Sequence, residues 1–253
     1  MYLDRIIAVR NNKTIYRDGD RCMKMFGADY SKADVLNEAL NQARMEETGL
    51  PIPKILEVTV IDGKWTIVSE YIKGKTLAQL MQENTGKKDE YLNLFADLQL
   101  TVHSQTCPLL NKLKDKMNRR ISQSDFSATV RYDLHTRLES MPKHNKVCHG
   151  DFNPSNIIIS ENSIPYILDW SHAAQGNASA DAAHTYLLFC LNGDMDSAKR
   201  YLELFCQKSN IAMQYVQKWM PIVAVSQTVK GNEKVCDFLC SWISMAESAK
   251  GEK

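Results

Sequence analysis

A short polar segment, residues 149–156, carries the side chains of this sequence whose types and spacing best fit catalysis. It begins with His149-Gly150-Asp151 and ends at Asn156, and Asp169 follows thirteen positions later. A carboxylate such as Asp151 can accept a proton from an attacking hydroxyl group. An amide oxygen and a carboxylate, from Asn156 and Asp169, suit Mg²⁺, which prefers oxygen ligands. The segment therefore supplies the base and the metal ligands that phosphoryl transfer to a hydroxyl group requires.

Two apolar runs are expected to bring the metal-ligand candidates together. Ile157–Ile159 and Tyr166–Leu168 read as strands, and the polar residues 161–163 between them supply a turn. In an antiparallel hairpin, the end of the second strand lies beside the start of the first. The sequence therefore predicts that Asn156 and Asp169 converge. The alternative is a polar β-turn in which Asp151 and Asn156 only satisfy backbone groups and Asp169 is a surface acid.

The segment resembles the catalytic loop of the aminoglycoside phosphotransferase and choline kinase family, the small-molecule relatives of protein kinases. The matching patterns are His-Gly-Asp-x-x-x-x-Asn over 149–156 and Leu-Asp-Trp over 168–170. The resemblance implies ATP or GTP as phosphoryl donor, Mg²⁺ as cofactor, Asp151 as catalytic base, and Asn156 and Asp169 as metal ligands. His149 is expected to brace the loop through hydrogen bonds.

The resemblance also implies a lysine paired with a glutamate upstream, which together hold the donor phosphates. Lys24 lies in a strand-like run, where alternation places it among apolar side chains. Glu38 lies inside a helix expected to begin after Ser31. Two other glutamates, Glu46 and Glu47, lie near the end of that helix and are less well placed. The alternative is an ordinary strand lysine and a solvated helix glutamate.

Two further nucleotide contacts are expected from the resemblance. Glu70-Tyr71-Ile72, before Gly74, resembles the interlobe hinge whose backbone groups bind the adenine edge, although a plain strand–turn–helix junction has the same pattern. No Gly-x-Gly-x-x-Gly occurs between residues 5 and 24. Asn11 and Asn12 tolerate left-handed backbone and can offer N–H groups to a phosphate instead.

The order of strand-like and helix-like segments predicts an α+β, bilobal, protein-kinase-like fold. Residues 1–72 would form a small antiparallel sheet with one helix, and 73–253 a larger, mainly helical lobe with the catalytic loop and acceptor site. The 253 residues carry a net charge of +1, which argues against a nucleic-acid partner. No apolar run reaches the length of a membrane span. Seven scattered cysteines without Cys-x-x-Cys fit a reduced, cytoplasmic protein, expected as a monomer or weak dimer.

The acceptor is expected to be a small molecule. Only twelve positions separate Asp169 from Asp181, too few for the peptide platform of a protein kinase, which makes a protein acceptor the weaker alternative. From residue 171 onward, eight acidic and eight basic side chains balance, so a polycationic aminoglycoside is not favoured over a sugar, amino alcohol or hydroxy amino acid. The acceptor-contact candidates are His172, Gln175, Asn177, Trp219 and Gln227, with a core position favoured for Trp219.

Two more positions resemble structural residues of the family. Asp181 is expected to hydrogen-bond the backbone of the catalytic loop, and plain helix capping is its alternative. His103, which follows Val102, resembles the histidine of the Leu-His that closes a family helix, and an ordinary polar helix end is equally compatible. The rival to an enzyme is a catalytically idle, kinase-like module that binds a nucleotide or another ligand.

Overall fold

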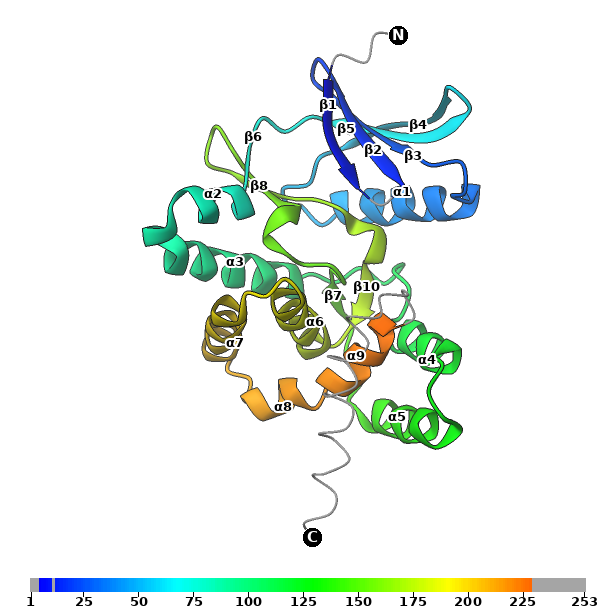
Figure 1. Ribbon diagram of the computed structural model, residues 1–253, viewed down its shortest axis with the longest axis vertical. Coiled ribbons are helices and arrows are strands. Elements are labelled where there is room, and N and C mark those ends of the chain that lie inside the picture. Colours follow the sequence, from blue (N-terminus) through cyan, green and yellow to red (C-terminus); the bar gives the residue numbers. More distant parts are fainter. Residues whose placement is uncertain (1–4, 11, 229–253) are drawn as a thin grey trace. The chain divides into compact units, whose positions relative to one another are not determined.

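The computed structural model describes residues 5–10 and 12–228, which divide into two compact units. The first unit contains the chain up to Thr85 together with Pro154–Ala173. The second contains Gly86–Asn153 and the chain from Ala174 onward. Figure 1 labels the elements of both units. The fold is α+β, as predicted.

The first unit is built on a five-stranded antiparallel sheet in the order β1-β2-β3-β5-β4. Its strands are β1 (Arg5–Arg10), β2 (Lys13–Asp18), β3 (Arg21–Phe26), β4 (Ile55–Ile61) and β5 (Lys64–Glu70). Tight turns join consecutive strands where Gly19 (φ +57°) and Gly63 (φ +73°) adopt left-handed backbone, which glycine does without a steric penalty. These are the two Asp-Gly hairpins that the sequence indicates.

One helix, α1 (Lys32–Glu46), packs on this sheet. Ser31 caps it by accepting a hydrogen bond from the Asp34 N–H (3.1 Å), and the helix begins where the sequence predicts. Its apolar side contributes Val35 and Ala39 to a core with two residues of the sheet, Phe26 and Ile67. This packing fixes which turn of α1 faces β3.

A smaller antiparallel sheet of the first unit contains the predicted hairpin. Its order is β6-β8-β9, with β6 (Gly74–Thr76), β8 (Ile157–Ser160) and β9 (Pro165–Ile167). Thr76 caps α2 (Leu77–Glu83) in a reciprocal capping box with Gln79. Short 3₁₀ turns occur at Thr85–Lys87, Pro154–Asn156 and Trp170–His172.

The second unit is mainly helical. Its helices are α3 (Lys88–His103), α4 (Leu113–Gln123), α5 (Ala128–Ser140), α6 (Ala178–Leu191), α7 (Met195–Ser209), α8 (Met213–Gln217) and α9 (Met220–Thr228). A two-stranded ladder pairs β7 (Lys146–Cys148) with β10 (Ala174–Gly176). Phe95 packs against Phe152, Phe189 and Tyr201 in the core, and Trp219 is buried as favoured from the sequence.

The compact units and the predicted lobes divide the chain differently. Helix α2 and residues 154–173 cluster with the N-terminal sheet, whereas the sequence assigns both to the lobe of residues 73–253. The division into lobes of residues 1–72 and 73–253 stays a prediction. Among the described helices, none has the length and apolar character needed to cross a bilayer.

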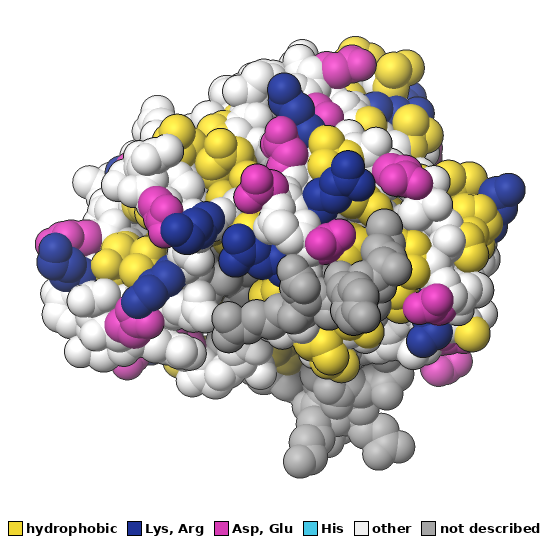
Figure 2. Space-filling model, turned by 90° about the horizontal axis from the view of Figure 1, so that it is seen from above, with side chains coloured by type: hydrophobic (Ala, Val, Ile, Leu, Met, Phe, Trp, Pro, Cys, Tyr) yellow, Lys and Arg dark blue, Asp and Glu magenta, His cyan; other side chains and the backbone are white. Residues whose placement is uncertain are grey.

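The described surface is mixed in charge. On the face shown in Figure 2, acidic and basic side chains of the described residues are interspersed, in keeping with the near-zero net charge. The five described cysteines are free thiols. Cys236 and Cys240 lie outside the described residues.

Candidate active site

Three predicted site residues meet in the first unit. The Nζ of Lys24 lies 2.5 Å from Glu38 Oε1 and 3.2 Å from Asp169 Oδ1. Lys24 projects from the middle of β3, and Glu38 comes from the α1 face that covers the sheet and is only 7% exposed. The ion pair expected between Lys24 and Glu38 is therefore present, and Asp169 is its second carboxylate.

The charges of this cluster hold one another in their ionised forms. Burial alone would lower the pKa of Lys24, but attraction to Asp169 and Glu38 outweighs burial and raises the pKa. Burial alone would raise the pKa of Asp169, but Lys24, Lys13 and the Ser171 hydroxyl hold it well below its usual range. Both pKa shifts favour the charged forms of Lys24 and Asp169.

A second lysine, Lys13, completes the cluster, and the sequence reasoning missed it. Its Nζ lies 3.0 Å from Glu38 Oε2, so each carboxylate oxygen of Glu38 takes one lysine. The ammonium also lies 4.9 Å from the centroid of the Phe26 ring. The β2–β3 register pairs Lys13 with Phe26 and Ile15 with Lys24, which puts both lysines on one face of the sheet. Alternation along residues 13–18 was the signal that could have revealed this.

The hairpin brings the two predicted metal ligands together. Ile157 pairs with Ile167, and the Leu168 N–H donates to the Asn156 carbonyl (2.8 Å), which places the start of β8 beside the segment that leads to Asp169. Asn156 is 2% exposed. An amide oxygen and an ionised carboxylate are donors that Mg²⁺ accepts when the substrate phosphates and water supply its remaining ligands. The donor set therefore fits this ion.

The Asp169 carboxylate is held in place by a strained local backbone. Asp169 has φ +60° and ψ +64°, a left-handed conformation that costs a non-glycine residue free energy and clusters at functional sites. The buried Trp170 indole N–H donates to the Ile167 carbonyl (3.1 Å), and the Ser171 hydroxyl donates to Asp169 Oδ1 (2.9 Å). These bonds on both sides of Asp169 stabilise the turn.

In the second unit, Asp181 organises the catalytic loop. Its carboxylate accepts hydrogen bonds from the backbone N–H groups of His149 (3.1 Å) and Gly150 (2.8 Å), as predicted. Gln99 Nε2 and His103 Nε2 lie 3.2 and 2.9 Å from the same group. Burial alone would raise the pKa of Asp181, but these partners, His103 foremost, hold it well below its usual range.

His103 is thus a buried partner of this carboxylate and not a solvated helix end. Gly150 adopts φ +76°, which explains why glycine stands between His149 and Asp151. The loop conformation and the buried carboxylate are therefore linked through the N–H groups of His149 and Gly150.

His149 and Asn153 flank the base candidate Asp151. The Asp151 N–H donates to His149 Nδ1 (3.2 Å), and Asn153 Nδ2 donates to Asp151 Oδ1 (3.3 Å). His149 is fully buried, which favours a bracing role for its imidazole. The role of Asp151 itself stays a prediction.

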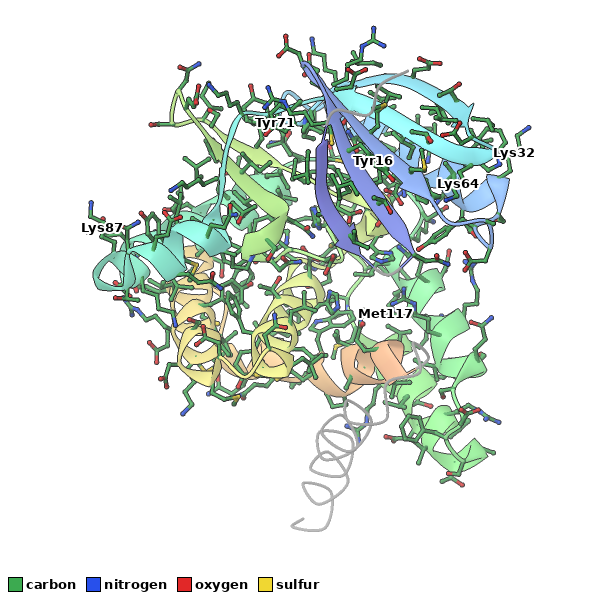
Figure 3. All side chains as sticks on the ribbon, turned by 45° about the horizontal axis from the view of Figure 1, so that its top comes forward. Tyr16, Lys32, Lys64, Tyr71, Lys87 and Met117 are labelled. Carbon is green, nitrogen blue, oxygen red and sulfur yellow. The ribbon has the colours of Figure 1, made fainter. Side chains whose placement is uncertain are left out.

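The predicted hinge is partly engaged within the first unit. The Glu70 N–H donates to the Lys54 carbonyl and the Tyr71 N–H to the Asp20 carbonyl, both at 2.9 Å. The Tyr71 ring, labelled in Figure 3, lies 4.2 Å beneath the Arg17 guanidinium. Within the described residues, Ile72 has no such backbone partner for its N–H. Adenine binding by these three residues stays a prediction.

The turn expected to cover the donor phosphates contains Asn11 and Asn12, and the structure describes the second of them. Asn12 adopts φ +63°, the left-handed backbone expected for it, and its carbonyl accepts from the Gly27 N–H (2.7 Å). A side chain at Gly27 would meet the side-chain amide of Asn12. Asn11 lies outside the described residues.

The acceptor-contact candidates separate into three locations. Gln175, Asn177 and Trp219 line one cavity of the second unit. The side-chain amide nitrogen of Gln227 instead lies 2.7 Å from Nε2 of the buried His184. His172 belongs to the first unit.

Comparisons with known proteins define the family. The model of the phosphotransferase enzyme family matches residues 7–217, more than half of the chain. The chain therefore belongs to this family. No curated protein matches it in sequence.

The fold is that of known small-molecule kinases. A thermostable mutant of aminoglycoside phosphotransferase APH(4)-Ia, apo form, is 16% identical with a TM-score of 0.71, over 98% of this chain and 95% of that one. Another mutant of that enzyme, in ternary complex with AMP-PNP and hygromycin B, is 15% identical with a TM-score of 0.70, over 95% and 91%. Choline kinase LicA from Streptococcus pneumoniae is 15% identical with a TM-score of 0.60, over 94% and 91%.

Proposed function

We propose that this protein transfers the γ-phosphoryl group of ATP or GTP to a hydroxyl group of a small molecule. The observation that carries the proposal is the position of the Lys24 ammonium between Glu38 and Asp169. A buried lysine held by a helix glutamate next to a metal-binding carboxylate is the arrangement that kinases use to bind donor phosphates. Family membership and the fold support the same reaction class.

Each site residue of the first unit has a role in this proposal. Lys24 binds the donor phosphates, Glu38 orients Lys24, and Asn156 with Asp169 would hold Mg²⁺. The ion, when bound, neutralises charge on the phosphate oxygens. Lys13 adds a second cation on the same sheet face, where the usual glycine-rich loop is missing from the sequence.

Asp151 acts on the acceptor. Its carboxylate orients the acceptor hydroxyl and takes its proton as the oxygen forms a bond to the γ-phosphorus. The bond from that phosphorus to the bridging oxygen breaks, and the nucleoside diphosphate leaves with the bonding electrons. His149 and Asn153 hold the Asp151 backbone and carboxylate through the bonds described above.

Neighbouring structures support a nucleotide donor and a small acceptor. One neighbour binds AMP-PNP together with hygromycin B, and another is a choline kinase. For this chain we propose a sugar, amino alcohol, hydroxy amino acid or aminoglycoside as acceptor. We also propose that it acts in the cytoplasm as a monomer or weak dimer, without a nucleic-acid or membrane partner.

The test is a product screen. The purified protein is incubated with Mg-ATP or Mg-GTP and pooled aminoglycosides, sugars, amino alcohols and hydroxy amino acids, and mass spectrometry seeks a compound that gains one phosphoryl group. Asp151→Asn is the matched control because it removes the base and preserves the shape of the side chain. A product made only by the native protein supports the proposal. Nucleotide binding without any product would favour the catalytically idle module.

A further inference from the structure

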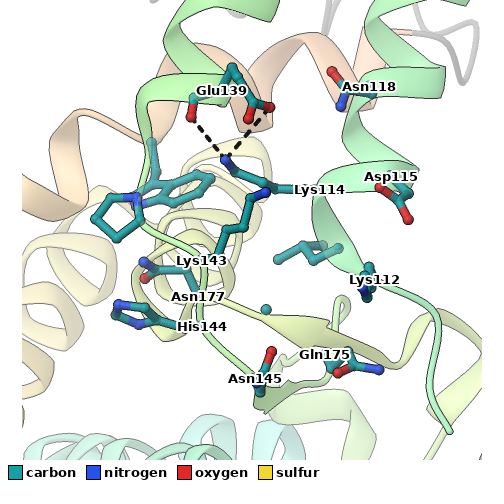
Figure 4. A pocket seen from close by; sticks show the side chains of 14 residues that line it. Lys112, Lys114, Asp115, Asn118, Glu139, Lys143, His144, Asn145, Gln175 and Asn177 are labelled. Atoms are coloured by element: carbon teal, nitrogen blue, oxygen red, sulfur yellow. Dashed lines mark hydrogen bonds and ion pairs between the residues drawn. The ribbon is translucent and has the colours of Figure 1, made fainter. Parts of the chain in front are cut away.

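The second unit contains a cavity of about 210 Å³ that the proposed reaction does not explain. Its wall is formed by the first turn of α4, the end of α5 with the segment that follows it, and the end of β10 (Figure 4). Three lysines lie in this wall, Lys112, Lys114 and Lys143, against two carboxylates, Asp115 and Glu139. The cavity is therefore lined by more cations than anions.

Lys114 is the poorly compensated lysine of the cavity. The Lys114 side chain is only 16% exposed, yet its carboxylate partner, Glu139, is 3.9 Å away and 69% exposed. Its closer contact is the backbone carbonyl of Glu139, at 3.1 Å. Lys112 and Lys143 are exposed, and within the described part of the chain neither forms an ion pair, so both are free to turn toward a bound anion. A mostly buried ammonium without a close carboxylate is costly, and an anion in the cavity would offset that cost.

Backbone groups add to the positive potential. Helix α4 begins at Leu113, and its N-cap residue, Lys112, provides no side-chain acceptor for the first N–H groups. These groups carry the positive end of the helix dipole. Lys112, Leu113, Lys114 and Asp115 all line the cavity, so the helix start and two of the lysines act on the same space.

A neutral acceptor group, the Gln175 amide, completes the wall beside Lys112 and opposite Lys114 and Lys143. Both N–H bonds of the Gln175 amide are directed to backbone carbonyls, at 2.8 Å from Pro108 and 2.6 Å from Leu110. The Gln175 Oε1 atom is then the part of this amide that can receive a hydroxyl or ammonium group. In Figure 4, Gln175 and Asn145 lie on one side of the cavity and Lys114 and Lys143 on the other.

We propose that this cavity binds a small molecule bearing a carboxylate or phosphate group, with the anionic group toward Lys114 and Lys143. The ligand's other end, a hydroxyl or ammonium group, faces Gln175. The anionic group belongs either to the acceptor of the phosphoryl transfer or to a separate effector. This site needs no nucleotide, so its test is independent of the proposed reaction.

The test is an NMR titration of the full-length, ¹⁵N-labelled protein with inorganic phosphate and, separately, with acetate. We expect saturable shifts of the backbone N–H signals of Leu113 and Lys114 and of the Gln175 side-chain amide. Lys143→Met should weaken this binding roughly tenfold, because a charge-assisted hydrogen bond is lost. Lys208→Met is the matched control, since Lys208 lies in the same unit and pairs with Asp97 (2.8 Å).

The outcomes separate the possibilities. Equal affinity in the native protein and in Lys143→Met, or shifts of the same size with neutral glycerol, would overturn the proposal. Absence of saturable shifts at these signals would do so as well. Once an acceptor is known, competition of phosphate against it would identify the anion as part of the acceptor. Binding without competition would identify an effector site.

Discussion

Replacing Asp181 by Asn tests whether one buried carboxylate holds the catalytic loop. The carboxylate is 3% exposed and accepts from the N–H groups of His149 and Gly150, with two more side-chain partners. An amide keeps the size of the side chain, removes the charge and turns one acceptor into a donor. One of the two loop N–H groups then loses its partner and faces an opposing N–H.

The magnitude follows from these bonds. A hydrogen bond to a charged group contributes about 1.5–3 kcal/mol, and an unpaired buried partner adds a further cost. We therefore expect Asp181→Asn to lower the free energy of unfolding by about 3–5 kcal/mol. That is a large part of a typical domain's total stability, which is about 5–15 kcal/mol.

The assay is urea unfolding followed by circular dichroism and tryptophan fluorescence, with each transition fitted separately because the chain has two compact units. Asp97→Asn is the matched control, since the Asp97 side chain is 56% exposed and pairs with Lys208 on the surface of the second unit. We expect that control to change stability by about 1 kcal/mol or less. A loss for Asp181→Asn as small as that of the control would refute the reasoning.

Four further outcomes are expected. Asp169→Ala should abolish turnover and leave the circular dichroism spectrum unchanged, whereas unchanged turnover would remove the metal assignment. Lys13→Met should weaken ATP or GTP binding by roughly tenfold, measured by calorimetry, because it removes a cation beside Glu38. Lys32→Met is the surface control and should bind normally, since the Nζ of Lys32 lies 5.3 Å from the Trp65 ring centroid. Chelation by EDTA should stop turnover and added Mg²⁺ should restore it, and turnover that persists in EDTA would contradict the proposed cofactor. The stability should fall as the pH drops from about 5 to about 2: Asp169 and Asp181 have folded-state pKa values held below their ordinary range, so the unfolded chain takes up protons first. A flat stability profile over that range, measured by urea unfolding, would contradict this.

The parts of the site that depend on local sequence were predictable. The hairpin follows from two apolar runs and a polar turn, so the approach of Asn156 to the segment before Asp169 could be expected from spacing alone. The helix that carries Glu38 was visible from its cap, Ser31, and its apolar periodicity. In both cases neighbouring residues in the sequence determine the geometry.

The parts that depend on tertiary packing were not predictable. Lys13 joins the cluster because of the β2–β3 register, and its partner Glu38 is 25 positions away. The anionic-ligand cavity combines α4, α5 and β10, whose packing no local pattern specifies. Gln227 was proposed as an acceptor contact from its residue type, yet its amide bonds to His184 inside the helical unit. Residue type alone does not reveal which polar groups are already satisfied.

The most direct test of the proposed activity follows the phosphoryl group itself. The native protein and Asp151→Asn are each given ATP, and then GTP, labelled with ¹⁸O on the γ-phosphate, together with the pooled acceptors. The account predicts a product from the native protein alone that carries the heavy phosphoryl oxygens and keeps its own hydroxyl oxygen. A labelled product formed equally by Asp151→Asn would contradict the assigned base, and nucleotide binding without any labelled product would contradict the phosphotransferase.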